Sequence, residues 1–301
     1  MKKISIVLMF LLVSIFANAK EITVSILPQK YFVQKIVGDN FNINVMVKPG
    51  ASPATYEPKS SQMRDLVKSD VYFSIGVPFE NVWLERFKQN AKNTLFVDTS
   101  HGIEKIAMEK HSHGEKDHDE HDEHKHEKHE DHDEDHHEHA GLDPHVWLDP
   151  VLVKMQAKNI LDAVVKIDSS NKDFYEKNYE NFMKELNILH NDIKNILEET
   201  THKEFMVFHP SWGYFAKRYD LEQIAIEVEG KEPKPNEMVE MIEDAKKHNI
   251  KIVFVAPQFS QNSAKTISKS LNANVVTIDP LSLQWSKELV KTAKEIVKSY
   301  K

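Results

Sequence analysis

Short apolar runs alternate with longer amphipathic segments along most of the chain. Before residue 106, the β-branched runs ITVSILP, FNINVMV, VYFSIGV and TLFVDTS are separated by segments such as QKYFVQKIVGD and SSQMRDLVKSD. The alternation returns after residue 204 with EFMVFHP, LEQIAIEVEG, KIVFVAPQ and NVVTIDP. Strands that alternate with helices are typical of a mostly parallel sheet covered by helices. The pattern therefore predicts an α/β fold with two lobes.

Two helices are predicted between the lobes. Asp149 and Pro150 suit the N-cap and the first turn of a helix. A second helix, from about 171 to 199, carries a stripe of apolar residues at spacings of three and four: Tyr175, Tyr179, Phe182, Leu186, Leu189, Ile193 and Ile196. At 1.5 Å per residue it would be roughly 40 Å long, so a single rigid helix could join the lobes and limit their motion.

These elements predict an N-terminal lobe at 20–150, linking helices at 151–202 and a C-terminal lobe at 203–301. The opening MKKISIVLMFLLVSIFANA has a Lys-Lys start, an apolar run and a small-x-small end, which indicate a signal peptide at 1–19 cleaved after Ala19. The apolar run is shorter than the ~20 residues of a membrane-spanning helix. The chain contains no cysteine for a disulfide or a lipid anchor. We expect an exported, periplasmic monomer.

Charge is concentrated in one segment. Residues 109–139 contain 14 acidic and 4 basic residues, a net −10, together with 11 of the 17 histidines. Since the whole chain carries −8 and Lys2 and Lys3 contribute +2, the remaining mature chain is close to neutral, which argues against nucleic acid as a partner. The segment has no apolar side chain that could offset its ordering entropy, so it is predicted to be a disordered insertion in the N-terminal lobe.

The insertion is a candidate for weak metal binding. Imidazole and carboxylate groups bind zinc, nickel and copper, but ordering a mobile segment around an ion costs free energy. We expect several weak sites that use His118, His121, His124, His126, His129, His132, His136, His137 and His139. The alternative is a solvated segment of mixed charge without metal.

Three residues outside the insertion are candidate metal ligands. His145 lies in GLDPHVWLDP, just ahead of the predicted helix start. His209 follows the apolar run FMVF and precedes Pro210, which places it at the sheet edge where α/β folds bind ligands. Asp279 repeats that position in VVTIDP, although it also suits a turn before Pro280. Two imidazoles and a carboxylate with an open position suit a d-block ion.

The other histidines lack such settings, and His101, His190, His202 and His248 are predicted to be surface residues. Two histidines and a carboxylate also occur in metalloenzymes. The chain has no His-Glu-x-x-His helix to supply a general base, and the candidate ligands come from opposite lobes. We therefore predict a protein that is not an enzyme.

Several stretches resemble the periplasmic metal-binding proteins of zinc and manganese ABC importers, the ZnuA/TroA type. They are SILPQKYFVQKIVGD, VKPGASPATYEPKSSQM, DPHVWLDP, FHPSWGYFAKRYDL, EGKEPKPNEM, VAPQFS and TIDPL. The resemblance covers the mature chain, and the His-rich insertion is similar to one common in zinc-type members. It implies two α/β lobes joined by a long helix with one metal in the cleft. It also supports His145, His209 and Asp279 as ligands.

The chain departs from this family at residue 54. Members typically carry Pro-His-x-Tyr-Glu-Pro where this chain has SPATYEP, so Ala54 stands in place of a histidine ligand. The remaining position could be taken by water, by Glu57 or by a histidine of the insertion, the affinity and metal preference could shift, or the function could be lost.

The resemblance implies capture of Zn²⁺ and its delivery to a membrane permease. The alternatives are Mn²⁺ uptake and a free-standing metal buffer or adhesin. Because coordination needs neutral imidazole and ionised carboxylate, we expect metal affinity to fall as pH drops through the histidine range.

Overall fold

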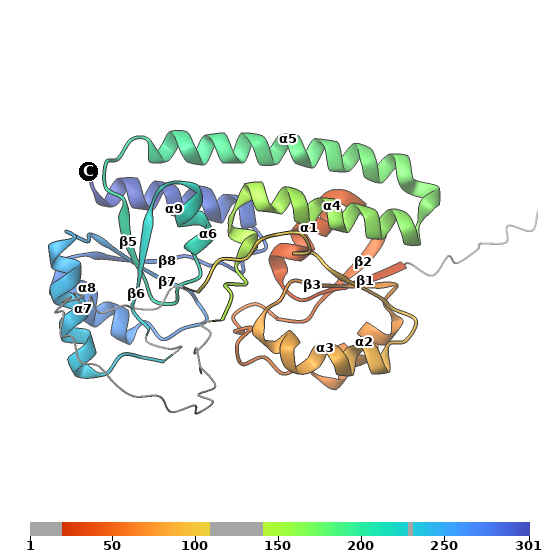
Figure 1. Cartoon of the computed structure of the whole chain (residues 1–301), viewed down its shortest axis with the longest axis horizontal. Helices are drawn as coiled ribbons and strands as arrows, with labels where there is room; N and C mark the ends of the chain where they lie inside the picture. Colours follow the sequence, from red (N-terminus) through yellow and green to blue (C-terminus); the bar gives the residue numbers. More distant parts are fainter. Residues whose placement is uncertain (1–19, 109–140, 228–230) are drawn as a thin grey trace, which may run out of the picture.

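The protein contains two parallel sheets covered by helices (Figure 1). The computed structural model describes residues 20–108, 141–227 and 231–301. The predicted signal peptide at 1–19 and the His-rich insertion at 109–139 lie outside these described residues. The fold predicted from the alternation of apolar and amphipathic segments is confirmed.

The N-terminal sheet has the strand order β2-β1-β3-β4. Its elements, in chain order, are β1 (Lys20–Val24), α1 (Leu27–Val37), β2 (Phe41–Val45), α2 (Ser60–Lys68), β3 (Val71–Ser74), α3 (Pro78–Asn90) and β4 (Leu95–Asp98). All three strand pairings are parallel, and Ile22 on β1 aligns with Ile43 on β2 and Val71 on β3. Every residue of β3 is buried, as expected for a strand covered on both faces.

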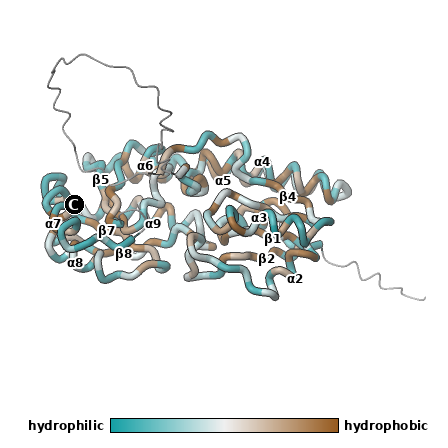
Figure 2. The backbone as a smooth tube through the Cα atoms, turned by 60° about the horizontal axis from the view of Figure 1, so that its bottom comes forward, coloured by the Kyte–Doolittle hydropathy of each residue, from teal (hydrophilic) through white to brown (hydrophobic). Residues whose placement is uncertain are grey.

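The C-terminal sheet repeats this topology with the order β6-β5-β7-β8. Its elements are β5 (Glu204–Val207), α6 (Gly213–Arg218), β6 (Glu222–Ala225), α7 (Pro235–Lys247), β7 (Ile252–Val255), α8 (Asn262–Leu271), β8 (Asn274–Thr277) and α9 (Trp285–Ser299). All of its pairings are parallel as well. Figure 2 shows hydrophobic residues along β5 and β7 and hydrophilic residues along α7 and α8.

Between the sheets the chain forms a short 3₁₀ turn, η1 (Val146–Leu148), followed by α4 (Pro150–Ile167), a second 3₁₀ turn, η2 (Ser169–Asn171), and α5 (Lys172–Leu197). The predicted start of α4 is confirmed, because the Asp149 side chain accepts a hydrogen bond from Val151 N at 2.7 Å and Pro150 is the first helical residue. Helix α5 has 26 residues and runs along both lobes (Figure 1). No helix within the described ranges is long and apolar enough to cross a membrane.

The buried face of α5 joins the two lobes into one core. It packs on α1 and α4 at one end and on α9 at the other. Six of its apolar side chains are buried: Tyr175, Phe182, Leu186, Leu189, Ile193 and Leu197. One hydrophobic cluster therefore extends from the first sheet through α5 to α9, while a second, smaller cluster lies in the C-terminal lobe around Met206 and Phe208.

The shared topology determines where side chains can converge. In the N-terminal sheet, β2 lies on one side of β1 while β3 and β4 lie on the other, so the strand order reverses between β1 and β3. The order reverses in the same way between β5 and β7 in the C-terminal sheet. Ligands of α/β folds bind beyond the carboxyl ends of strands at such a reversal. The segments that follow these strands therefore carry the candidate site.

Candidate metal centre

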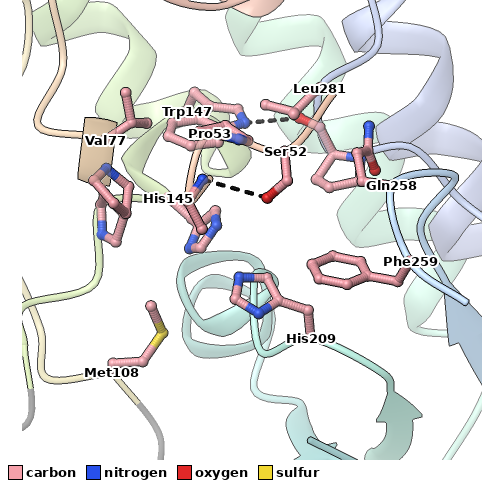
Figure 3. A pocket seen from close by; sticks show the side chains of 14 residues that line it. Ser52, Pro53, Val77, Met108, His145, Trp147, His209, Gln258, Phe259 and Leu281 are labelled. Atoms are coloured by element: carbon pink, nitrogen blue, oxygen red, sulfur yellow. Dashed lines mark hydrogen bonds between the residues drawn. The ribbon is translucent and has the colours of Figure 1, made fainter. Parts of the chain in front are cut away.

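A pocket lies between the segments that follow the strands of the two sheets (Figure 3). Its volume is about 80 Å³, several times the ~10–15 Å³ that a single water needs. Most of the lining is apolar: Pro53, Ala54, Val77, Pro78, Met108, Pro144, Trp147, Phe259, Pro280 and Leu281. The polar lining residues are Ser52, His145, His209 and Gln258. Residues of the N-terminal lobe and of the C-terminal lobe thus enclose two imidazole rings.

His145 and His209 lie next to each other in this pocket, although 64 positions separate them in the chain (209 − 145). Their ring centroids are 5.4 Å apart and the ring planes are inclined at 70°. His145 packs against Trp147 at 5.0 Å, and His209 stacks on Phe259 at 5.1 Å. Aromatic contacts on both rings limit their rotation, which holds the pair in place.

A carboxylate orients each ring. Asp143 Oδ1 lies 2.6 Å from His145 Nδ1, and Glu227 Oε1 lies 2.6 Å from His209 Nδ1. A neutral imidazole in this setting donates its Nδ1 proton to the carboxylate, which leaves the lone pair on Nε2 for a ligand. Metal-binding histidines are commonly held in this way, because the carboxylate fixes the tautomer and raises the basicity of the coordinating nitrogen.

The segment that carries His145 is hydrogen-bonded to the C-terminal lobe. Tyr214 OH donates to Asp143 O at 2.9 Å, and Trp147 Nε1 donates to Pro280 O at 2.8 Å. Trp285 Nε1 in turn donates to Trp147 O at 2.7 Å. The segment that carries His145 is therefore anchored by three hydrogen bonds to the lobe that carries His209.

Asp279 is engaged in its own turn. Its Oδ1 accepts from Gln258 Nε2 at 2.9 Å and from Leu281 N at 3.0 Å, and the residue is absent from the pocket lining. Glu57 is exposed and also lies outside the lining. Among the residues that the structure describes, no three His, Cys, Asp or Glu side chains converge closely enough to hold a metal ion. The ligand roles of Asp279 and Glu57 stay predictions.

Ala54 presents its methyl group to the pocket, at the place where the family typically has histidine. The nine insertion histidines named above lie outside the described residues. His101 and His248 are exposed, as predicted for surface residues. By contrast, His190 and His202 are half-buried. Burial lowers the pKa of His190, whose Nδ1 lies 3.3 Å from Tyr219 OH, while His202 stacks on Tyr300 at 4.2 Å.

Sequence reasoning missed both orienting carboxylates. Asp143 precedes His145 by two residues in LDPHVW, a spacing at which an aspartate commonly bonds the backbone two residues on, and its Oδ1 also accepts from His145 N at 2.8 Å. Glu227 follows β6, the strand beside β5, and its backbone N donates to Phe208 O at 3.0 Å. An acidic residue just beyond a neighbouring strand was the signal available for it.

Comparison with known proteins places this chain in a family. The family model described as ZnuA, zinc-uptake complex component A, periplasmic, matches residues 22–299. The chain belongs to the ZnuA family. The resemblance predicted from the sequence motifs is thereby confirmed.

Relatives of this ZnuA-family chain include the high-affinity zinc uptake system protein ZnuA of Bacillus subtilis, 28% identical over 84% of this chain and 76% of its own length. The zinc-binding protein AdcA of Streptococcus pyogenes is 27% identical over 96% of this chain, which spans only 58% of AdcA. A crystal structure of ZnuA matches with a TM-score of 0.81 at 38% identity, over 93% of this chain and 99% of that one. A zinc-bound ZnuA deletion mutant matches with a TM-score of 0.81 at 37% identity, over 94% of this chain and 98% of that one.

Proposed function

We propose that this ZnuA-family protein captures Zn²⁺ in the periplasm and delivers it to the permease of an ABC importer. The observation that carries the proposal is the pair of carboxylate-held imidazoles, His145 and His209, facing one pocket with ring centroids 5.4 Å apart. Family membership and the similarity to a zinc uptake protein of Bacillus subtilis support the same cargo. The predicted signal peptide at 1–19 supports export.

The donor chemistry favours zinc over manganese. Imidazole suits Zn²⁺, whereas Mn²⁺ prefers carboxylate, carbonyl and water oxygens. The described pocket lining contains two imidazoles and no carboxylate. The Mn²⁺ alternative stays compatible with a set in which oxygen ligands join the two imidazoles.

Zinc in a four-coordinate site needs two donors besides the imidazoles. Both hydrogen bonds recorded for the Asp279 carboxylate within the described residues go to Oδ1, so we propose Oδ2 as the third ligand. Because the Ala54 methyl cannot coordinate, water or Glu57 completes the set. This assignment makes Asp279 the ligand that moves when zinc binds, while the histidine pair is already in place.

Delivery to the permease needs a change in affinity between the free and the docked protein. One wall of the pocket, which includes Pro53, Val77 and Pro78, comes from the segments that follow β2 and β3 of the N-terminal lobe. Small rotations about the α5 linkage would change this wall and leave the histidine pair intact. We propose that docking lowers the zinc affinity by moving Asp279 and the pocket wall that the N-terminal lobe contributes.

A competition titration between Zn²⁺ and Mn²⁺ tests this function. The tight site of the mature protein should prefer zinc to manganese. His145→Ala or His209→Ala should lower the zinc affinity by more than the ~10–100-fold that loss of a residue bonded to a ligand typically costs. His101→Ala, an exposed histidine outside the pocket, is the matched control and should leave the tight site unchanged. Preference for Mn²⁺, or pocket variants that behave like the control, would refute the assignment.

A further inference from the structure

The pocket contains one donor that the zinc proposal does not use, the thioether of Met108. Met108 is the one sulfur-bearing residue among the 14 that line the described pocket. Figure 3 shows its side chain on the side opposite Phe259, with the sulfur facing the rings of His145 and His209. A soft donor thus shares the pocket with two imidazole nitrogens.

The position of Met108 is fixed by backbone pairing. Met108 N donates to Gly141 O at 3.0 Å, and Asp143 N donates to Ile106 O at 2.8 Å. Between these two hydrogen bonds, Ala107 forms an antiparallel bridge with Leu142. This short ladder ties the Met108 backbone to the segment that ends in Asp143 and His145.

The ladder is itself fixed to the C-terminal lobe. Tyr214 OH accepts a hydrogen bond from Ile106 N at 3.1 Å and donates to Asp143 O at 2.9 Å. One phenol therefore bonds both strands of the ladder. The ladder that carries Met108 and leads to His145 is therefore hydrogen-bonded to Tyr214 of the lobe that carries His209.

Methionine also serves as a flexible hydrophobic filler, which would make its sulfur irrelevant. The donor set argues otherwise, because thioether ligands select Cu(I) and imidazole suits copper as well as zinc. We propose that Met108 makes this pocket a site for Cu(I), held by His145 Nε2, His209 Nε2 and the Met108 sulfur. The inference rests on the proposed function only because both use His145 and His209. It adds Cu(I), a soft monovalent ion, to the ions that this pocket binds.

X-ray absorption of the mature full chain, loaded with one equivalent of Cu(I) without oxygen, tests the proposal directly. The segment 109–139 contains no methionine, so its histidines cannot supply a sulfur ligand. We expect copper–sulfur scattering in the wild type and its loss in Met108→Leu, which keeps the bulk and removes the sulfur. Met155→Leu, at an exposed methionine on α4, is the matched control and should retain the scattering.

A competition titration against bicinchoninate, a Cu(I) chelator, gives the second measurement. Met108→Leu should lower the ratio of Cu(I) affinity to Zn²⁺ affinity at least tenfold relative to the wild type and to Met155→Leu. Absence of sulfur scattering in the wild type, its persistence in Met108→Leu, or an unchanged ratio would each overturn the proposal. Tight zinc binding without copper–sulfur scattering defeats this inference alone, whereas copper–sulfur scattering without tight zinc binding defeats the proposed function alone.

Discussion

Asp143 bonds His145 twice: its Oδ1 accepts a hydrogen bond from the His145 backbone N at 2.8 Å and lies 2.6 Å from the ring Nδ1. The Asp143 backbone is anchored as well, because its carbonyl oxygen accepts a hydrogen bond from Tyr214 OH at 2.9 Å. The aspartate therefore connects the scaffold of the C-terminal lobe to the imidazole. His145 is oriented before any ligand arrives.

Asp143→Asn should weaken zinc without unfolding the protein. An amide of the same shape can still bond the backbone N but no longer carries the charge that raises the basicity of the imidazole. We expect zinc affinity to fall about 10–100-fold, measured by chelator competition. Asp162→Asn on the exposed surface of α4 is the control, and equal affinities for the two variants would contradict the role given to Asp143.

Arg218→Met should destabilise the fold through Asp149. Arg218 Nε and Nη2 lie 2.8 and 2.7 Å from Asp149 Oδ2, and the Asp149 side chain is only 3% exposed. Removing the arginine leaves a buried carboxylate without its cation, at a cost of about 2–4 kcal/mol given the partial exposure of Arg218.

The control for Arg218→Met is Lys158→Met, which breaks the exposed pair with Asp162 on α4 and should cost less than about 1 kcal/mol. Urea unfolding of both variants gives the comparison. Equal losses would show that Arg218 contributes no more than a surface ion pair.

Glu80 should make stability depend on pH. Burial raises the pKa of its carboxyl to about 7. Hydrogen bonds from Ser25, Gly76 N and Ile75 N lower this pKa, but by less than burial raises it. Because the folded protein holds this proton more tightly than the unfolded chain, the stabilisation is complete below pH 4.5 and is lost as pH rises towards 7.

Glu80→Gln mimics the protonated form and should remove this dependence. The stability of the variant relative to the wild type should grow between pH 4.5 and 7, by up to about 3 kcal/mol, and level off above that range. Thermal unfolding of both proteins across pH 4.5–8 measures the difference. A constant difference over this range would show that the carboxyl titrates at the same pH in the folded and unfolded states.

Much of this architecture could be predicted from the sequence. The three-four spacing along α5 depends only on which residues must be buried, and five of the seven predicted stripe residues are buried: Tyr175, Phe182, Leu186, Leu189 and Ile193. The N-cap at Asp149 is equally local, since a capping side chain bonds its own helix. Such features are determined by neighbours in the chain, so a pattern in the chain predicts them.

The site was predictable only in part, because its geometry depends on contacts between distant elements. The position of His209 after a strand correctly placed it at the sheet edge, but the same rule applied to Asp279, whose Oδ1 bonds Gln258 and Leu281 N in its own turn. A strand end specifies the edge and not the direction of the side chain. The pairing of Glu227 with His209 depends on β6 lying beside β5, which spacing along the chain does not show.

Ala54→His should strengthen zinc binding. Ala54 lines the pocket with His145 and His209 and is exposed, so an imidazole there has space and meets the other two rings. A third imidazole supplies a nitrogen ligand in place of water, and we expect at least a tenfold gain in zinc affinity by chelator competition. Ala54→Leu, which fills the position without a donor, is the control. A histidine variant no tighter than the wild type would mean that the position lies outside the coordination sphere.

The most direct test of the central claim is zinc calorimetry of the mature protein beside a version that lacks residues 109–139. If the pocket around His145 and His209 is the capture site, the shortened protein keeps one tight zinc ion per chain and loses only weak ions. The double variant His145→Ala, His209→Ala of the shortened protein should then bind none tightly. If the tight site disappears with the insertion alone, the insertion supplies essential ligands, and the account of an autonomous pocket is wrong.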